Sequence, residues 1–166
     1  KKINDLTVLD KGEAEIRDYI KISKCRPFVV KEQGYIPPKK SLFNKIVGDS
    51  HFELEFASFL EDCEDIVSYA KNYFSVHFKI DYRDASGEIR DYYPDFIVKT
   101  SEKDLYIVET KGREDLDDPL KIARLKQWCE DVNKSQAKVK CHCVYVRQEE
   151  YEKYTPKNFS GLIKNF

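Results

Sequence analysis

The amino-acid sequence predicts an α/β domain in which a mixed β-sheet carries helices on its faces. Three observations support this class. An apolar stripe at helical spacing begins after Ser50, two short apolar runs follow around a polar turn, and a second amphipathic segment leads into a final alternating run. In chain order, the segments predict a helix, three strands, a second helix and a last strand.

The first helix is expected to begin after Ser50 and to end near Asn72. Ser50 and Glu53 have the spacing of a capping box, in which two side chains satisfy N–H groups at the start of a helix. Apolar residues then recur every three or four positions, which gives a stripe wide enough to be buried. These residues are Phe52, Phe56, Phe59, Leu60, Cys63, Ile66, Val67 and Ala70.

Three strands are expected next. Residues 73–82 alternate loosely and predict the first strand, which the turn Asp84-Ala85-Ser86-Gly87 ends. The second and third strands are the apolar runs 96–99 and 105–108, separated by the polar segment 100–104.

A hairpin folded symmetrically about Glu102 pairs Ile97 with Ile107, and therefore Asp95 with Glu109. Directly opposed residues have Cβ atoms roughly 5 Å apart. Because side chains alternate along a strand, Lys111 lies on the same face. The sequence therefore predicts two carboxylates and an ammonium at one end of the sheet.

The second helix is expected to start at Asp117-Asp118-Pro119, where an Asp cap precedes a proline at the first helical position. Residues 137–146 alternate and predict the last strand. Within it, Cys141 and Cys143 share a face opposite His142. Because no second cysteine pair at zinc spacing exists, we interpret this trio as core packing rather than a metal site.

The predicted organisation has three parts. Residues 1–48 form a lead-in that packs on the domain or joins it to a neighbour, with a short helix at 14–22 and a short strand at 28–30. Residues 49–147 form the core, and residues 148–166 form a C-terminal extension that is helical in part. The chain contains no methionine, even at position 1, which indicates a piece of a longer polypeptide.

Composition excludes several classes of protein. The formal net charge of −1 provides no global basic field for nucleic acid. No apolar run approaches the roughly 20 residues that span a bilayer, and no signal peptide is visible. Five scattered cysteines argue against a disulfide framework and predict a reducing, cytoplasmic setting.

The expected cluster of Asp95, Glu109 and Lys111 points to metal chemistry. Opposed carboxylates repel unless a cation lies between them, and hard ions such as Mg²⁺ bind carboxylate oxygens, waters and substrate phosphates. Lys111 could orient a water or neutralise charge on a phosphate. The alternative is a solvated hairpin end, because such spacing arises often by chance in a chain that is 36% charged.

These residues resemble a known family. Pro94-Asp95 followed by Glu109-Thr110-Lys111 is similar to the motif of the PD-(D/E)xK nuclease superfamily. The fuller strings 92–98 and 106–114 resemble the C-terminal endonuclease domain of type III restriction enzyme R (Res) subunits and related helicase-fused nucleases. The similarity runs from about Ser41 to about Asn133, and it includes the segments 52–57, 70–72 and 128–133.

The resemblance implies a restriction-endonuclease-like αβββαβ core and an Mg²⁺-dependent endodeoxyribonuclease, with Mn²⁺ as a substitute ion. Asp95, Glu109 and the Thr110 carbonyl would hold the metal, and Lys111 would act on the substrate. Such a domain cuts double-stranded DNA within a larger restriction enzyme. ATP would be used only by a helicase region upstream in the same chain, and a methyltransferase (modification) subunit would be a partner.

The family also implies residues on both helices. The acid expected on the first helix aligns with Glu53, with Glu55 as the alternative; a capping role alone would also explain Glu53. On the second helix, Lys121, Arg124 and Gln127 are candidates for DNA phosphate contacts, and a solvated helix face is the competing interpretation, above all for Arg124.

Two other functions stay open at the level of sequence. One is a repair or recombination nuclease with the same site. The other is a catalytically silent DNA-binding or interaction module, against which the presence of all three motif charges argues.

Overall fold

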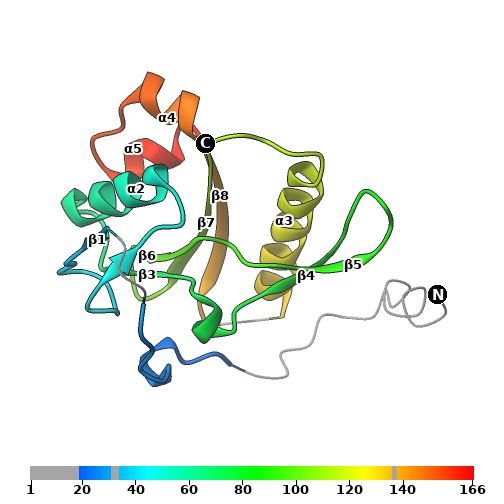
Figure 1. Ribbon diagram of the computed structural model, residues 1–166, viewed down its shortest axis with the longest axis horizontal. Coiled ribbons are helices and arrows are strands. Elements are labelled where there is room, and N and C mark those ends of the chain that lie inside the picture. The colour runs from blue at the N-terminus through cyan, green and yellow to red at the C-terminus, as the bar shows by residue number, and fades with distance from the viewer. Residues whose placement is uncertain (1–18, 31–33, 136–137) are drawn as a thin grey trace.

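A four-stranded mixed sheet organises the protein in the computed structural model, which describes residues 19–30, 34–135 and 138–166 (Figure 1). The strand order is β3-β6-β7-β8. β6 pairs antiparallel with β3 and β7, whereas β7 and β8 run parallel. The strands are β3 (Ser68–Lys71), β6 (Phe96–Lys99), β7 (Asp104–Lys111) and β8 (Lys140–Arg147).

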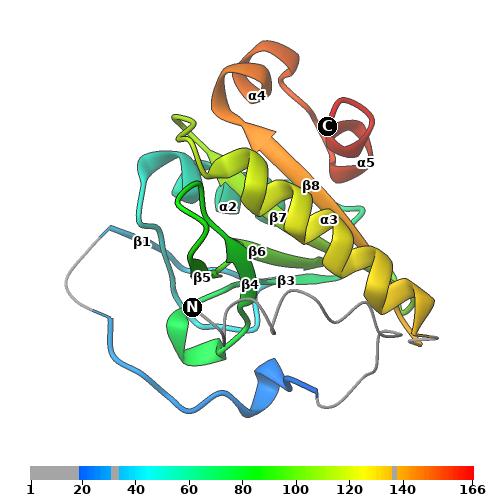
Figure 2. The ribbon, with the colours of Figure 1, turned by 90° about the vertical axis from the view of Figure 1, so that its right-hand side faces the viewer.

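Helices cover both faces of this sheet (Figures 1 and 2). One face carries α2 (His51–Asp62) together with the C-terminal helices α4 (Gln148–Tyr154) and α5 (Phe159–Ile163). The other face carries α3 (Asp118–Lys134). The chain order α2-β3-β6-β7-α3-β8 is the αβββαβ core that the sequence predicts, and the fold class is therefore confirmed.

Smaller elements lie around the core. β1 (Tyr35–Ile36) and β2 (Ile46–Val47) form one antiparallel pair, and η1 (Ile22–Lys24) and η2 (Phe74–Val76) are short 3₁₀ helices. The hairpin of β4 (Ile80–Arg83) and β5 (Ile89–Tyr92) is inserted between β3 and β6.

The hairpin turn is the one expected at residues 84–87. The Gly87 N–H donates to the Asp84 carbonyl over 2.9 Å, and Gly87 has φ +85°, a left-handed conformation that glycine adopts without steric cost.

Alternation along the strands divides the apolar residues into two core layers. Phe96, Val98 and Val108 pack with Phe56 in the layer under α2. Ile97 and Ile107 face the other way and pack with Leu125 and Cys129 of α3. Each strand is therefore buried on both faces, which suits the continuous apolar runs in β6 and β7.

The first predicted helix is too long and the first predicted strand is misplaced. α2 ends at Asp62, and Cys63 already has extended dihedrals, φ −70° and ψ 108°. Residues 68–71 form β3 by pairing with β6, which buries Tyr69 and Ala70. Their apolar spacing fits a helical stripe as well as a strand, and the hydrogen bonds to β6 decide between the two. Residues 73–82 contain η2 and, at their end, three of the four residues of β4.

Other boundaries differ in detail. The predicted strand at 28–30 does not form; instead, the Phe28 ring packs 5.1 Å from the Tyr73 ring. The predicted helix at 14–22 lies mostly outside the described residues, and Ile22 belongs to η1. α3 begins as expected, although the Asp117 carboxylate accepts the Ala85 N–H (3.0 Å) from the hairpin turn instead of capping its own helix. The C-terminal extension is helical in part, as predicted.

Phe56 is the aromatic residue on which the α2 layer depends most. Its ring is fully buried and packs against Phe52, Phe59, Phe96 and Tyr151. We predict that Phe56→Ala lowers the free energy of unfolding by about 3–5 kcal/mol, the usual cost of a large aromatic cavity. Urea denaturation followed by circular dichroism measures it.

Phe74→Ala is the matched control, since the Phe74 side chain is exposed. It should change the free energy of unfolding by no more than about 0.5 kcal/mol. Equal losses for the two variants would contradict the assignment of Phe56 to the core.

Candidate active site

The β6–β7 hairpin has the predicted register. Ile97 lies opposite Ile107, and Phe96 lies opposite Val108. Asp95 directly precedes β6 and is tied to the end of β7, because its Oδ2 accepts the Thr110 N–H (2.8 Å) and the Thr110 hydroxyl (2.6 Å). This pairing brings the Asp95 and Glu109 carboxylates to the same end of the sheet.

Both carboxylates are held in a poorly solvated place. Burial raises the pKa of Glu109 to about 8, and the charge of Asp95 acts in the same direction. The Tyr92 hydroxyl donates to Glu109 Oε2 over 2.9 Å, which partly offsets the rise. Burial likewise raises the pKa of Asp95, in spite of the opposing charge of Lys71.

Neither carboxylate forms an ion pair with a residue that the structure describes. Asp95 Oδ1 and Glu109 Oε1 also accept no hydrogen bond from the described part of the chain. The pair therefore has two open oxygen atoms, and burial and mutual charge oppose the ionisation of both carboxyl groups.

The start of α2 carries the next acid, Glu53. Its N–H donates to Ser50 Oγ (3.2 Å), and its carboxylate accepts the Asp49 N–H (3.1 Å), so the expected capping interaction forms with Asp49 as the second partner. The same carboxylate binds the ammonium of Lys71, which is only 3% exposed. Lys71 Nζ also lies 3.5 Å from Asp49 Oδ2.

The structure places Glu53, and not Glu55, on the side of the helix that faces the site. The Glu53 charge contributes to the raised pKa of Asp95, which locates the two groups near each other. Glu55 is exposed on the outer surface of α2.

Lys111 and Lys121 share a second group of charges at the start of α3. Lys111 Nζ lies 2.9 Å from Asp118 Oδ1 and 3.3 Å from Asp115 Oδ2. Lys121 Nζ lies 3.2 Å and 3.4 Å from the same two atoms. Burial would lower the pKa of Lys111, but the hydrogen bond and charge of Asp118 outweigh it and raise the pKa. Lys111 is therefore a cation and a hydrogen-bond donor at neutral pH.

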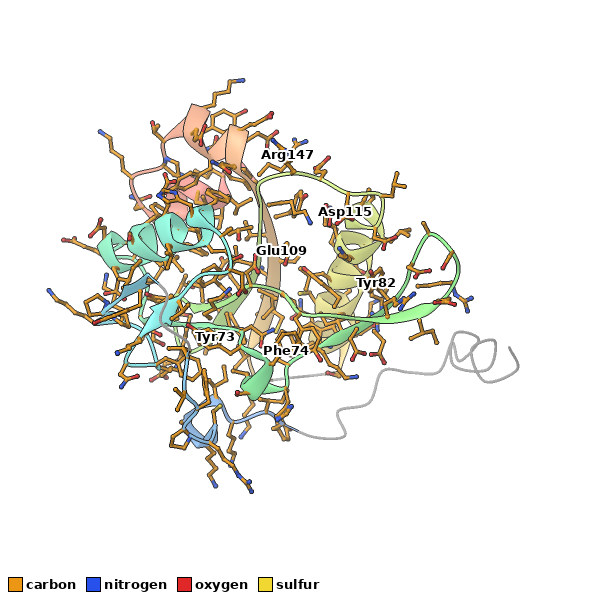
Figure 3. All side chains as sticks on the ribbon, viewed as in Figure 1. Tyr73, Phe74, Tyr82, Glu109, Asp115 and Arg147 are labelled. Atoms are coloured by element: carbon orange, nitrogen blue, oxygen red, sulfur yellow. The ribbon has the colours of Figure 1, made fainter. Side chains whose placement is uncertain are left out.

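The three candidates on α3 have different partners in the structure. Lys121 stands beside Lys111, whereas Arg124 Nε donates to the Asp81 carbonyl of β4 (3.1 Å) and Gln127 donates to Asp131 on its own helix (2.8 Å). Figure 3 shows Glu109 between the sheet and α3, with Asp115 at the start of that helix. Of these three residues, only Lys121 shares the acidic partners of Lys111.

Sequence analysis assigned no role to Lys71 or Tyr92, which contact the site acids. Lys71 belongs to the string Ala70-Lys71-Asn72 that the family resemblance contains, but a lysine in a charged chain gives no sign that it is buried. Tyr92 ends β5 and is buried, but it shares its strand face with the exposed Arg90, so alternation in the sequence does not indicate that its hydroxyl reaches inward.

The cysteine trio of β8 packs as predicted. Cys141 and Cys143 contact the layer under α3, and the His142 ring stacks 4.6 Å from the Tyr106 ring on the opposite face. Across residues 19–30, 34–135 and 138–166, no three His, Cys, Asp or Glu side chains converge as a complete metal cage. No helix in these ranges is long and apolar enough to cross a membrane.

A mixed sheet with helices on both faces and the αβββαβ order is consistent with a restriction-endonuclease-like fold. The family model of the endonuclease domain matches residues 39–155, which is more than half of the chain, and the protein therefore belongs to this family. Neither the curated proteins nor the solved structures contain a significant match.

The raised pKa of Glu109 predicts an unusual pH dependence. Because the folded pKa of about 8 lies above the ordinary value of 4.5, the folded state binds this proton more tightly than the unfolded chain. The contribution of Glu109 to stability is complete below about pH 4.5 and is lost as the pH rises through about 8.

In EDTA, the free energy of unfolding of the wild type should therefore fall relative to that of Glu109→Gln between pH 5 and pH 9. Urea denaturation of both proteins at several pH values measures this difference. A difference that stays constant across the range would contradict the assigned environment of Glu109.

Proposed function

We propose that the protein is an Mg²⁺-dependent endonuclease that hydrolyses phosphodiester bonds of DNA at Asp95 and Glu109. The observation that carries the proposal is the pair of half-buried carboxylates with open oxygen atoms and no cationic partner among the described residues. Membership of the endonuclease domain family supports the reaction class.

The donor set fits a hard divalent ion. Asp95 Oδ1, Glu109 Oε1 and the Thr110 carbonyl are the oxygens that would hold Mg²⁺, with Mn²⁺ as a substitute. Two carboxylates suffice for Mg²⁺, because this ion keeps several waters and shares substrate phosphates. When bound, the ion lowers the pKa of a water and neutralises charge on the phosphate.

The remaining charged groups have distinct tasks in this proposal. Lys111 donates to the phosphate or to the attacking water, and Asp118 and Asp115 hold its ammonium in place. Glu53 is the third acid of the cluster, and its carboxylate pairs with the Lys71 ammonium. Lys121 contacts a neighbouring DNA phosphate, and Arg124 and Gln127 extend this contact along α3.

The setting that we propose comes from the strings shared with type III restriction enzymes. In it, the domain acts in the cytoplasm on double-stranded DNA within an ATP-dependent restriction enzyme. A helicase region of the same polypeptide uses the ATP, and a methyltransferase subunit reads the DNA sequence. The net charge of −1 supports this division of labour, since tight DNA binding needs more cationic contacts than this chain offers.

We predict that the wild type nicks plasmid DNA slowly with Mg²⁺ at low salt and not in EDTA. Asp95→Asn and Glu109→Gln should abolish nicking, and Glu53→Gln should weaken it. In a metal-binding readout that needs no activity, Mg²⁺ should raise the Tm of the wild type at pH 9 and leave that of Glu109→Gln unchanged.

Glu55→Gln is the matched control, since Glu55 lies on the exposed side of α2. It should nick at the wild-type rate. Metal-independent nicking would refute the proposed reaction, whereas metal binding without nicking would favour a silent module.

Lys111→Ala tests the role of the ammonium. The variant should bind Mg²⁺ normally in the Tm assay but cleave about 10²–10³-fold more slowly, the usual loss for a preorganised donor to transition-state charge. Single-turnover nicking assays compare it with Lys103→Ala, which changes an exposed lysine in the β6–β7 turn. Cleavage by Lys111→Ala at the wild-type rate would make Lys111 a structural partner of Asp118.

A further inference from the structure

Two grooves meet at Phe74, next to the carboxylates. The smaller, about 170 Å³, is lined by Asp95, Lys71, Asn72, Tyr93 and Phe74 among others. The larger, about 690 Å³, lies between residues 21–28 and residues 74–77. Phe74 lines both grooves and Asp95 lines the smaller one, so the two grooves adjoin at Phe74 and extend from residues 21–28 toward Asp95.

The Phe74 side chain protrudes from the surface where the two grooves meet. This side chain is 76% exposed, and its ring makes a T-shaped contact with the Tyr93 ring, with the ring centroids 4.6 Å apart. The 3₁₀ turn explains the exposure, since η2 directs Val76 into the core and Phe74 away from it. The result is a supported aromatic ring that offers a face beside a catalytic carboxylate.

The larger groove is basic. Lys21, Lys24 and Arg26 are exposed on one wall, and none of them forms an ion pair with a described residue. His77 lies on the other wall, and no Asp or Glu is among the described residues that line the groove. In a chain of net charge −1, this local excess of cations suits an anionic ligand.

The basic wall is attached to the aromatic junction. The Cys25 thiol donates to the Ser75 carbonyl (3.1 Å), and the Phe28 ring packs against Tyr73. The wall therefore keeps a fixed position beside η2.

We propose that one unpaired strand of DNA lies along these two grooves. Its phosphates contact Lys21, Lys24 and Arg26, one unstacked base rests on Phe74, and the strand continues toward Asp95. Aromatic rings beside a cationic groove are the common means of binding single strands. A base inside a duplex has both faces covered, so Phe74 selects an unpaired nucleotide. Only the reaction at the end of this path rests on the proposed endonuclease function.

The test is binding of a fluorescein-labelled oligo-dT strand in EDTA, followed by fluorescence anisotropy. The wild type should bind this strand more tightly than a duplex of the same length. Phe74→Ala should weaken single-strand binding about 5- to 150-fold, the range for loss of one stacked base. Phe74→Tyr should keep it. Tyr35→Ala removes an exposed aromatic side chain of β1 and should have no effect.

The salt dependence tests the basic wall. Arg26→Ala should weaken binding and reduce the slope of log affinity against log salt by about 0.7, the value for one lost phosphate contact on a single strand. Lys103→Ala, at the opposite end of the sheet, should leave the slope unchanged. Equal affinity for strand and duplex, or binding unaffected by Phe74→Ala, would overturn the proposal.

Nicking assays on the same preparations separate the two proposals. Nicking without Phe74-dependent strand binding would reject the strand path and retain the endonuclease. Strand binding through Phe74 without nicking by the wild type would retain the path and reject the endonuclease.

Discussion

The structure depends on the antiparallel pairing of β6 and β7, which holds Asp95 and Glu109 at one end of a buried sheet. The register of Ile97 and Ile107 fixes which residues meet there. A slip of one residue would reverse the face of every side chain on β7, and the two core layers would no longer match α2 and α3. The packing that stabilises the domain therefore also enforces the repulsion between its two carboxylates.

This repulsion is confined to one place because the surrounding charges are neutralised locally. On one side, Lys71 is paired with Glu53 and Asp49. On the other side, Lys111 and Lys121 are paired with Asp118 and Asp115. Each lysine lies close enough to lower the pKa of a central carboxylate, yet its hydrogen bonds go to other acids. In the proposed function, an ion from solution would balance the remaining charge.

The sequence predicted those parts of the fold that local patterns determine. The hairpin register followed from two apolar runs around a polar turn, and the Asp117-Asp118-Pro119 start of α3 followed from capping chemistry. The end of α2 could not be predicted in the same way. Ile66 and Ala70 have helical spacing, and a strand buried on both faces shows no strict alternation, so only the hydrogen bonds to β6 show which structure forms.

The residues of the candidate site likewise divide into those that local patterns predict and those that they do not. Asp95, Glu109 and Lys111 were predictable because neighbouring strands of short separation bring them together. Lys71 and Tyr92 were not, since their contacts with Glu53 and Glu109 join elements that are not paired strands of one sheet. Burial of a lysine is rare enough that a charged sequence gives no reason to expect it.

The geometry also implies an order of events. In the proposed function, loss of the proton that Glu109 keeps at neutral pH would leave two neighbouring negative charges, and these would repel a DNA phosphate until their charge is balanced. Lys111 cannot balance it alone, because its ammonium is already shared by Asp118 and Asp115. In the proposed function, a cation bound between the carboxylates would remove this barrier and lower the pKa of Glu109, so that Glu109 is ionised at neutral pH. Ion binding and substrate binding would thus be coupled through a single electrostatic requirement at the end of the β6–β7 hairpin.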